Sequence, residues 1–190
     1  ILDFLRNNRD QASLTDIVSA RNPFNKSTSY RGVTNVDKKL CYKIHTSNGV
    51  GLVPISEIDP NINNTNKYKV IVSRAISGHA GEMDANGQAK VLAKVFVANP
   101  GEVCTDTYVT AGCFDTYEEA EHLMHYMQTK FVRFLLLQTI TSINITRENY
   151  KFVPIQDFKE DWTDDKLFEK YSKFIDSETK EIITTIIKNM

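Results

Sequence analysis

The spacing of hydrophobic positions changes from strand-like to helix-like near residue 112. Before that point, short apolar runs alternate with polar positions, and turn residues such as Ser47-Asn48-Gly49 separate them. This pattern is typical of half-buried strands. It predicts a hairpin over 41–53 and further strands over 68–73, 91–98 and 107–111. Between them, the polar segment 59–66 and the glycine-bearing segment 77–88 are expected to be loops.

After residue 112 the apolar positions recur every three or four residues. They predict one long helix over about 116–138, with Phe131 and Leu135 buried where it meets the sheet. Thr116 and Glu119 have capping-box spacing, which marks the start of that helix. Two shorter helices are expected after it, over about 164–174 and after Ser177, the second burying residues 182, 183, 186 and 187.

Strands followed by helices indicate an α+β fold. We therefore expect a mixed or antiparallel sheet, residues ~40–112, packed by the long helix ~116–138 and the C-terminal helices. Residues 1–190 are long enough for one domain with a core, β-rich to about 112 and helical from about 116. Ahead of the sheet, Ser13 is placed to cap a short turn that buries Leu14, Ile17 and Val18.

Charge is divided unevenly along the chain. The net charge is −1, but residues 1–100 carry 13 Lys and Arg against 8 Asp and Glu, whereas residues 101–190 carry 10 against 16. The first part is therefore net +5 and the second net −6. This split favours a basic face on the first half that could meet nucleic acid, although solvated surface charge is the simpler alternative.

The cysteines and the lengths of the apolar runs indicate the cellular compartment that we expect for the chain. Three cysteines without any CxxC pair suit free thiols in a reducing cytoplasm. No apolar run approaches the roughly 18 residues that a membrane span needs, so no membrane partner is expected.

Motifs for catalysis are missing from the sequence. There is no glycine-rich turn for a methyl donor, no Asn/Asp-Pro-Pro-aromatic loop for a flipped base and no Walker motif. The acidic run at 161–166 could suggest a nuclease metal site, but Thr163 or Asp164 there is better interpreted as a helix cap. We therefore expect no catalytic, cofactor-binding or metal-binding residue in this chain.

Histidine and cysteine offer weaker alternatives. His122 and His125 are three residues apart, but the sequence shows no further ligands for a metal, so a polar helix flank is the favoured interpretation. Cys104 could form a nucleophile pair with His79 or His45, yet a buried structural cysteine is the stronger expectation.

Five segments occur in an order that resembles the C-terminal region of bacterial Type II restriction–modification proteins with an adenine-specific DNA methyltransferase. These are PGEVCTDTY at 100–108, FDTYEEA at 114–120, TKFVRFL at 129–135, YKFVPIQDF at 150–158, and WTD followed by Leu167 and Lys170-Tyr171 at 162–171. The sequence departs from the pattern at Ser172, where a glycine is expected.

The resemblance implies a DNA target-recognition domain whose catalytic methyltransferase domain lies N-terminal to Ile1, in a longer chain. Its implied partners are double-stranded DNA and that methyltransferase domain. S-adenosylmethionine, with Mg²⁺ a further candidate, would be a cofactor of the parent protein and not of this chain. A subunit-contact or scaffolding module and a nuclease domain of the same system remain as alternatives.

We expect the basic first half of the chain to contact DNA, and the loop around 78–87 to enter a groove. The candidate DNA-binding residues are Arg21, Lys26, Arg31, Lys43, Arg74, His79 and Lys90.

Overall fold

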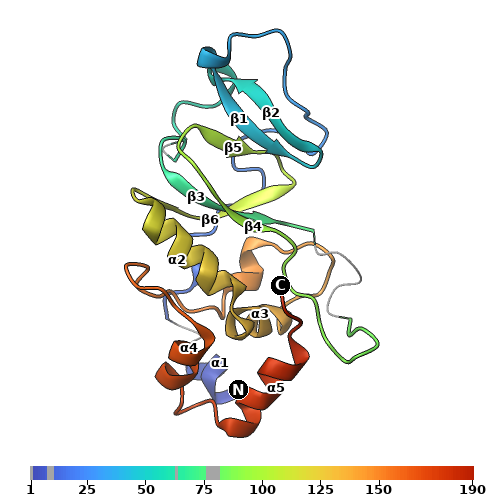
Figure 1. The fold of residues 1–190 in the computed structure, drawn as a ribbon, viewed down its shortest axis with the longest axis vertical. Coiled ribbons are helices and arrows are strands. Elements are labelled where there is room, and N and C mark those ends of the chain that lie inside the picture. The colour runs from blue at the N-terminus through green and yellow to red at the C-terminus, as the bar shows by residue number, and fades with distance from the viewer. Residues whose placement is uncertain (1, 8–10, 63, 76–81) are drawn as a thin grey trace.

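A computed structural model describes residues 2–7, 11–62, 64–75 and 82–190 of the chain (Figure 1). Two three-stranded sheets stack along its long axis, and helices cover the side of the second sheet that faces away from the first (Figure 1). The α+β fold expected from the sequence is confirmed. No helix within the described ranges is long and apolar enough to cross a membrane.

The first sheet has the order β2-β1-β5 and lies at the end of the molecule farthest from the helices (Figure 1). Strands β1 (Cys41–Thr46) and β2 (Gly49–Pro54) form the predicted antiparallel hairpin. Strand β5 (Glu102–Cys104) pairs with β1 in parallel. The sequence pattern missed β5 because it has only three residues and follows a turn directly.

The second sheet has the order β4-β3-β6 and is antiparallel. Its strands are β3 (Tyr68–Ser73), β4 (Val95–Ala98) and β6 (Tyr108–Phe114). Alternate residues of β3 enter two different cores: Val70 and Val72 join the larger cluster with the helices, whereas Ile71 joins the cluster with the first sheet. The central strand is therefore buried on both faces, which explains its continuous apolar run.

The prediction of a single long helix over 116–138 is wrong in one respect. Two helices occupy it, α2 (Tyr117–Gln128) and α3 (Lys130–Leu137), because the intervening Thr129 has an extended backbone (φ −60°, ψ 150°). Its hydroxyl accepts a hydrogen bond from the N–H of Val132 and so caps α3. Phe131 and Leu135 are both fully buried, as predicted.

The remaining helices gather below α3: α1 (Leu2–Asn7), α4 (Asp164–Lys170) and α5 (Ser177–Ile186) (Figure 1). Phe4 of α1 packs edge-on against Phe131 and Tyr171, with ring centroids 5.6 and 5.0 Å apart. Short 3₁₀ turns occur at Leu14–Asp16, Lys38–Leu40, Ile55–Glu57 and Arg147–Tyr150.

Several local expectations need correction. The strand expected over 91–98 is regular only from Val95, and α4 ends at Lys170 rather than at 174. Ile17 and Ile182 were expected to be buried but are exposed, because each lies on the solvent side of its turn or helix. The loop 77–88 lies partly outside the described residues, and its described part turns at Asp84–Gly87.

Candidate nucleic-acid interface

A shallow basic hollow of about 510 Å³ lies beside the β1–β2 hairpin. Residues 31–38, which we name the strap, line it together with both strands. The positive side chains around it are Arg31, Lys38 and Lys43. Val33, Val50 and Leu52 add an apolar floor. We refer to this feature as the basic hollow.

Two glycines allow the strap to lie directly on β2. A Cβ at Gly51 would meet the carbonyl oxygen of Arg31 at 2.5 Å, and one at Gly32 would meet the main-chain nitrogen of Leu52 at 2.8 Å. Gly32 also has φ +94°, a conformation that side-chain-bearing residues rarely adopt. The N–H of Val33 then donates to the carbonyl of Leu52 at 2.9 Å. The position of Arg31 beside β2 is therefore fixed by the backbone.

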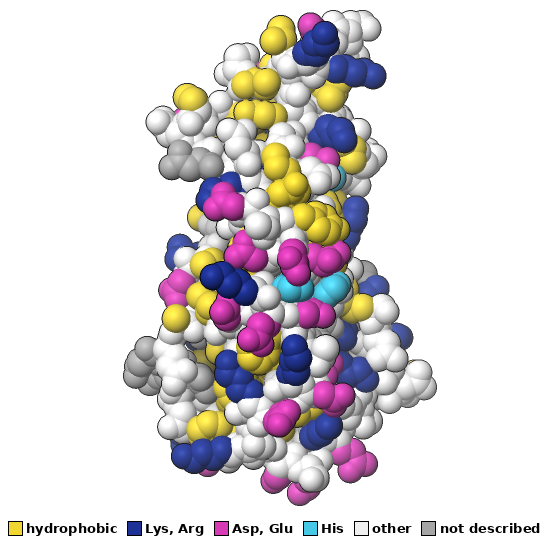
Figure 2. All heavy atoms as spheres, turned by 60° about the vertical axis from the view of Figure 1, so that its left-hand side comes forward, with side chains coloured by type: hydrophobic (Ala, Val, Ile, Leu, Met, Phe, Trp, Pro, Cys, Tyr) yellow, Lys and Arg dark blue, Asp and Glu magenta, His cyan; other side chains and the backbone are white. Residues whose placement is uncertain are grey.

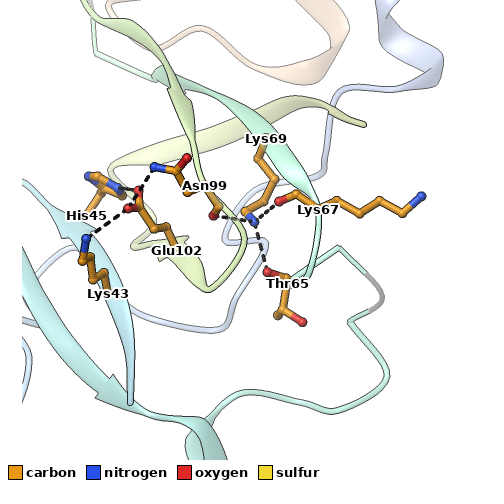
Figure 3. A network of polar contacts seen from close by, with 7 residues as sticks. All are labelled: Lys43, His45, Thr65, Lys67, Lys69, Asn99 and Glu102. Carbon is orange, nitrogen blue, oxygen red and sulfur yellow. Dashed lines mark hydrogen bonds and ion pairs between the residues drawn. The ribbon is translucent and has the colours of Figure 1, made fainter. Parts of the chain in front are cut away.

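Lys43 stands at the edge of a polar network (Figure 3). Its ammonium nitrogen lies 3.5 Å from the carboxylate of Glu102, and the Nε2 of His45 lies 2.9 Å from the same carboxylate. Burial raises the pKa of Glu102, but hydrogen bonds from His45 and Asn99, together with the positive charge of Lys43, outweigh it and hold the pKa below its ordinary value. The Lys43 side chain remains 64% exposed, so its charge can still reach a ligand.

Lys69 is the most deeply buried of the residues drawn in Figure 3. Its ammonium group donates to main-chain carbonyls, at 2.7 Å for Lys67, 3.1 Å for Asn64, 3.3 Å for Thr65 and 3.5 Å for Asn99. Burial lowers its pKa to about 8. It ties the loop before β3 to the turn before β5 and does not face solvent, so its role is structural.

Arg21 and Arg74 converge on one buried carboxylate, that of Asp106. Arg74 donates to it at 2.8 Å and also to the Asp106 carbonyl, with only 14% of its side chain exposed. Arg21 reaches the other oxygen at 2.7 Å but keeps 72% of its side chain exposed. Arg21 can therefore offer charge to a ligand, whereas Arg74 mainly compensates the buried acid.

The other candidate residues are scattered. Lys26 pairs with Glu57 at 2.7 Å and is 13% exposed. Lys90 is exposed but lies beside α3 and the C-terminal segment, away from the basic hollow. His79 lies outside the described residues. The structure thus brings together Arg31 and Lys43, and it adds Lys38, which was not among the candidates from the sequence.

Catalytic alternatives gain no support from the geometry. Among the described residues, no group of three His, Cys, Asp or Glu side chains could hold a metal ion. His122 contacts the carbonyl of Phe158 and His125 the carboxylate of Asp161, so both form the polar flank of α2. Cys104 is fully buried, and burial raises the pKa of its thiol.

Two residues of the acidic run at 161–166, Thr163 and Asp164, cap helices. The Thr163 hydroxyl accepts from the N–H of Lys166 and caps α4. Asp164 accepts from the N–H groups of Lys130 and Phe131 at the start of α3. The sequence interpretation of this run as a cap is confirmed, and the second cap, on another helix, was not foreseen.

Comparison with family models, curated proteins and solved structures finds no match for this chain.

Proposed function

We propose that this chain is a DNA sequence-recognition domain of a Type II restriction–modification protein. It would position double-stranded DNA for a methyltransferase domain of the same longer chain, in the cytoplasm. The observation that carries the proposal is the basic hollow, which joins three cationic side chains to the β1–β2 hairpin at the edge of the first sheet. The five ordered segments that resemble the restriction–modification family support the same conclusion.

The β1–β2 hairpin offers one of the shapes that the major groove of DNA admits, with β2 as the outer edge of its three-stranded sheet. The major groove admits a two-stranded β-ribbon, and β1–β2 stands at the free end of the elongated molecule (Figure 1). Its tip carries exposed Ser47 and Asn48, whose side chains can hydrogen-bond to base edges. The Thr46 hydroxyl holds this tip by donating to the Gly49 carbonyl and accepting from the Asn48 N–H. The tip is therefore ordered before any DNA arrives.

The cations are suited to the phosphates on either side of that groove. Arg31 is held by the carbonyls of Thr28 and Tyr30, at 2.6 and 3.1 Å, and remains exposed. Lys38 is exposed, and Lys43 shares only a long 3.5 Å contact with Glu102. Lys and Arg side chains stand at the ribbon end of the molecule in Figure 2. Phosphate contacts of this kind supply affinity, and base contacts supply sequence preference.

A scaffolding module is the second candidate. Figure 2 shows Asp and Glu side chains gathered across the middle of one face, with histidines beside them. Residues 101–190 carry the net charge of −6, which phosphates would repel. That face suits a basic protein partner, and it could serve the contact with another domain while the ribbon end meets DNA.

Selection from a pool of randomised duplexes tests the proposal. The 190-residue chain is expected to retain duplex DNA at low salt and to enrich one sequence motif over successive rounds. The same selection is repeated with the double variant Ser47→Ala/Asn48→Ala. This variant should still retain DNA but should lose enrichment at one or more positions of the motif. Retention without any enriched motif, or no retention at all, would favour the scaffolding module.

A further inference from the structure

A second pocket, of about 260 Å³, is separate from the basic hollow. Three segments enclose it: residues 90–93, Arg133 on α3, and residues 188–190. The segments are held together by main-chain hydrogen bonds, from the N–H of Ala89 to the Ile186 carbonyl at 2.7 Å and from the N–H of Lys188 to the Ala89 carbonyl at 3.1 Å. We name it the Arg133 pocket.

Arg133 is a buried cation without an ion-pair partner in the described part of the chain. Only 3% of the residue is exposed. Its Nε donates to the carbonyls of Gln128 and Thr129, at 3.0 and 3.3 Å, and its Nη1 donates to the Lys188 carbonyl at 2.6 Å. All of these acceptors are neutral, and the Nη2 group forms no hydrogen bond with a described residue.

Two positively charged side chains, those of Arg133 and Lys90, line the pocket without an ion pair to a described residue. Burial lowers the pKa of Arg133, and only the negative charge of Asp164 opposes that effect. The carboxylate of Asp164 already accepts two main-chain N–H groups of α3. Lys90 adds an exposed charge at the rim, whereas Lys188 is paired with Asp84 at 2.8 Å. A buried charge is normally compensated by a contacting partner of opposite sign, whereas the described side chains give Arg133 no ion pair and only the more distant charge of Asp164.

The pocket wall is also strained. Leu92 is buried and has φ +66°, a left-handed conformation that is unfavourable for a leucine. Such backbone strain persists only where the surroundings fix it, and it is concentrated at ligand-binding sites. Here the strained turn places Val91, Leu92 and Ala93 beside Arg133, so the guanidinium has an apolar wall that would strengthen any charge interaction.

We propose that the Arg133 pocket binds a phosphate-type oxyanion, with the guanidinium of Arg133 as the main donor and Lys90 as a second. A planar guanidinium matches the oxygens of a phosphate, and the charge of the ligand would compensate the buried cation. The same chemistry is present in the phosphodiester of a nucleic acid and in a free phosphate. The pocket lies at a different place from the basic hollow, so this proposal does not depend on DNA recognition.

Titration of the 190-residue chain with inorganic phosphate, at constant ionic strength, tests the proposal. The readout is the NMR signal of the Arg133 Nε–H group, which should shift and saturate. Lys90→Ala should weaken phosphate binding severalfold, and Arg133→Gln by about tenfold or more. Lys159→Ala, which removes an exposed lysine outside the pocket, is the matched control and should leave the titration unchanged. Lys90→Ala keeps the test decisive if Arg133→Gln does not fold.

The source of the phosphate is decided by a second titration with duplex DNA. If the pocket takes a phosphodiester, Lys90→Ala should also lower the salt dependence of DNA binding by about one unit. If it takes free phosphate, the variant should lose phosphate affinity alone. No saturable shift of the Arg133 signal in the wild-type chain, or equal shifts in wild type and Lys90→Ala, would overturn the proposal.

Discussion

The carboxylate of Asp164 lies 2.8 Å from the main-chain nitrogen of Phe131 and accepts its hydrogen bond. Asp164 belongs to α4, and Phe131 to the first turn of α3, 33 residues away. The second carboxylate oxygen accepts from Lys130 at 3.0 Å. An acid on one helix therefore satisfies two N–H groups at the beginning of another, where the helix has no internal acceptors for them.

Replacing Asp164 by alanine is expected to destabilise the fold by about 1–2 kcal/mol, the typical cost of losing an N-terminal cap. Asp165→Ala is the matched control, because Asp165 is exposed and forms only a 3.4 Å ion pair with Lys180. Its expected cost is below about 0.5 kcal/mol. Urea unfolding of both variants measures the difference. Equal stabilities of the two variants would show that the contact to α3 contributes little.

Leu135→Ala is expected to lower the free energy of unfolding by about 2–5 kcal/mol, because a fully buried leucine leaves a cavity when truncated. Ile182→Ala provides the comparison, since Ile182 lies on a neighbouring helix and is 43% exposed. It should cost far less. A melting temperature that does not change in Leu135→Ala would contradict the packing of α3 described above.

How far the sequence predicts this fold depends on the range of the interactions. The β1–β2 hairpin and the cap at Thr116 were predictable, because the residues that determine them are neighbours in the sequence. The break at Thr129 was not, since the helical spacing of apolar residues continues across it. Its cause includes Asp164, a residue that only the tertiary fold brings to that point.

The candidate site shows the same division. A basic first half was evident from the charge count, and it contained Arg31 and Lys43. That Arg74 serves Asp106 could not be foreseen, because the partners are 32 residues apart and nothing local links them. The strap was equally hidden: nothing local in the sequence links Gly32 with Gly51 of β2, and their close contact becomes visible only when β2 and the strap lie together.

Lys69 predicts a dependence of stability on pH. Its pKa is about 8 in the folded chain, whereas an unfolded lysine has a pKa near 10.4. Between these two values the unfolded chain binds more protons than the folded one, so this group makes stability rise as pH increases from about 8 to 10.4. The full difference amounts to about 3 kcal/mol.

Comparison with Lys69→Met isolates that contribution from other groups that titrate in the same range. Denaturant unfolding at pH 7.5 and at pH 10 should give a difference, wild type minus variant, that increases with pH. Lys67→Met, two residues away, is the matched control and should follow the wild-type curve. If the difference in free energy of unfolding between wild type and Lys69→Met is constant or decreases with pH, burial does not lower the pKa of Lys69.

The chain by itself is expected neither to methylate nor to cut DNA. The sequence lacks motifs for a methyl donor and a flipped base, and of the acids at 161–166 Asp164 caps a helix while Asp161 and Asp165 pair with His125 and Lys180. Incubation with plasmid DNA, S-adenosylmethionine and Mg²⁺ should leave the plasmid intact and unlabelled. Site-specific cleavage or methyl transfer by the purified chain would require a catalytic site that the geometry above does not provide.

DNA affinity at two salt concentrations tests the central claim most directly. Wild-type chain, Arg31→Ala and Lys43→Ala are titrated into a labelled duplex, with Lys159→Ala as the control outside the basic hollow. Each of the first two substitutions should weaken binding and lower the salt slope by about one unit, because each removes one phosphate contact. The control should match wild type. If Arg31→Ala and Lys43→Ala bind like wild type, or if no variant nor the wild-type chain binds duplex DNA at low salt, the basic hollow is not a DNA interface.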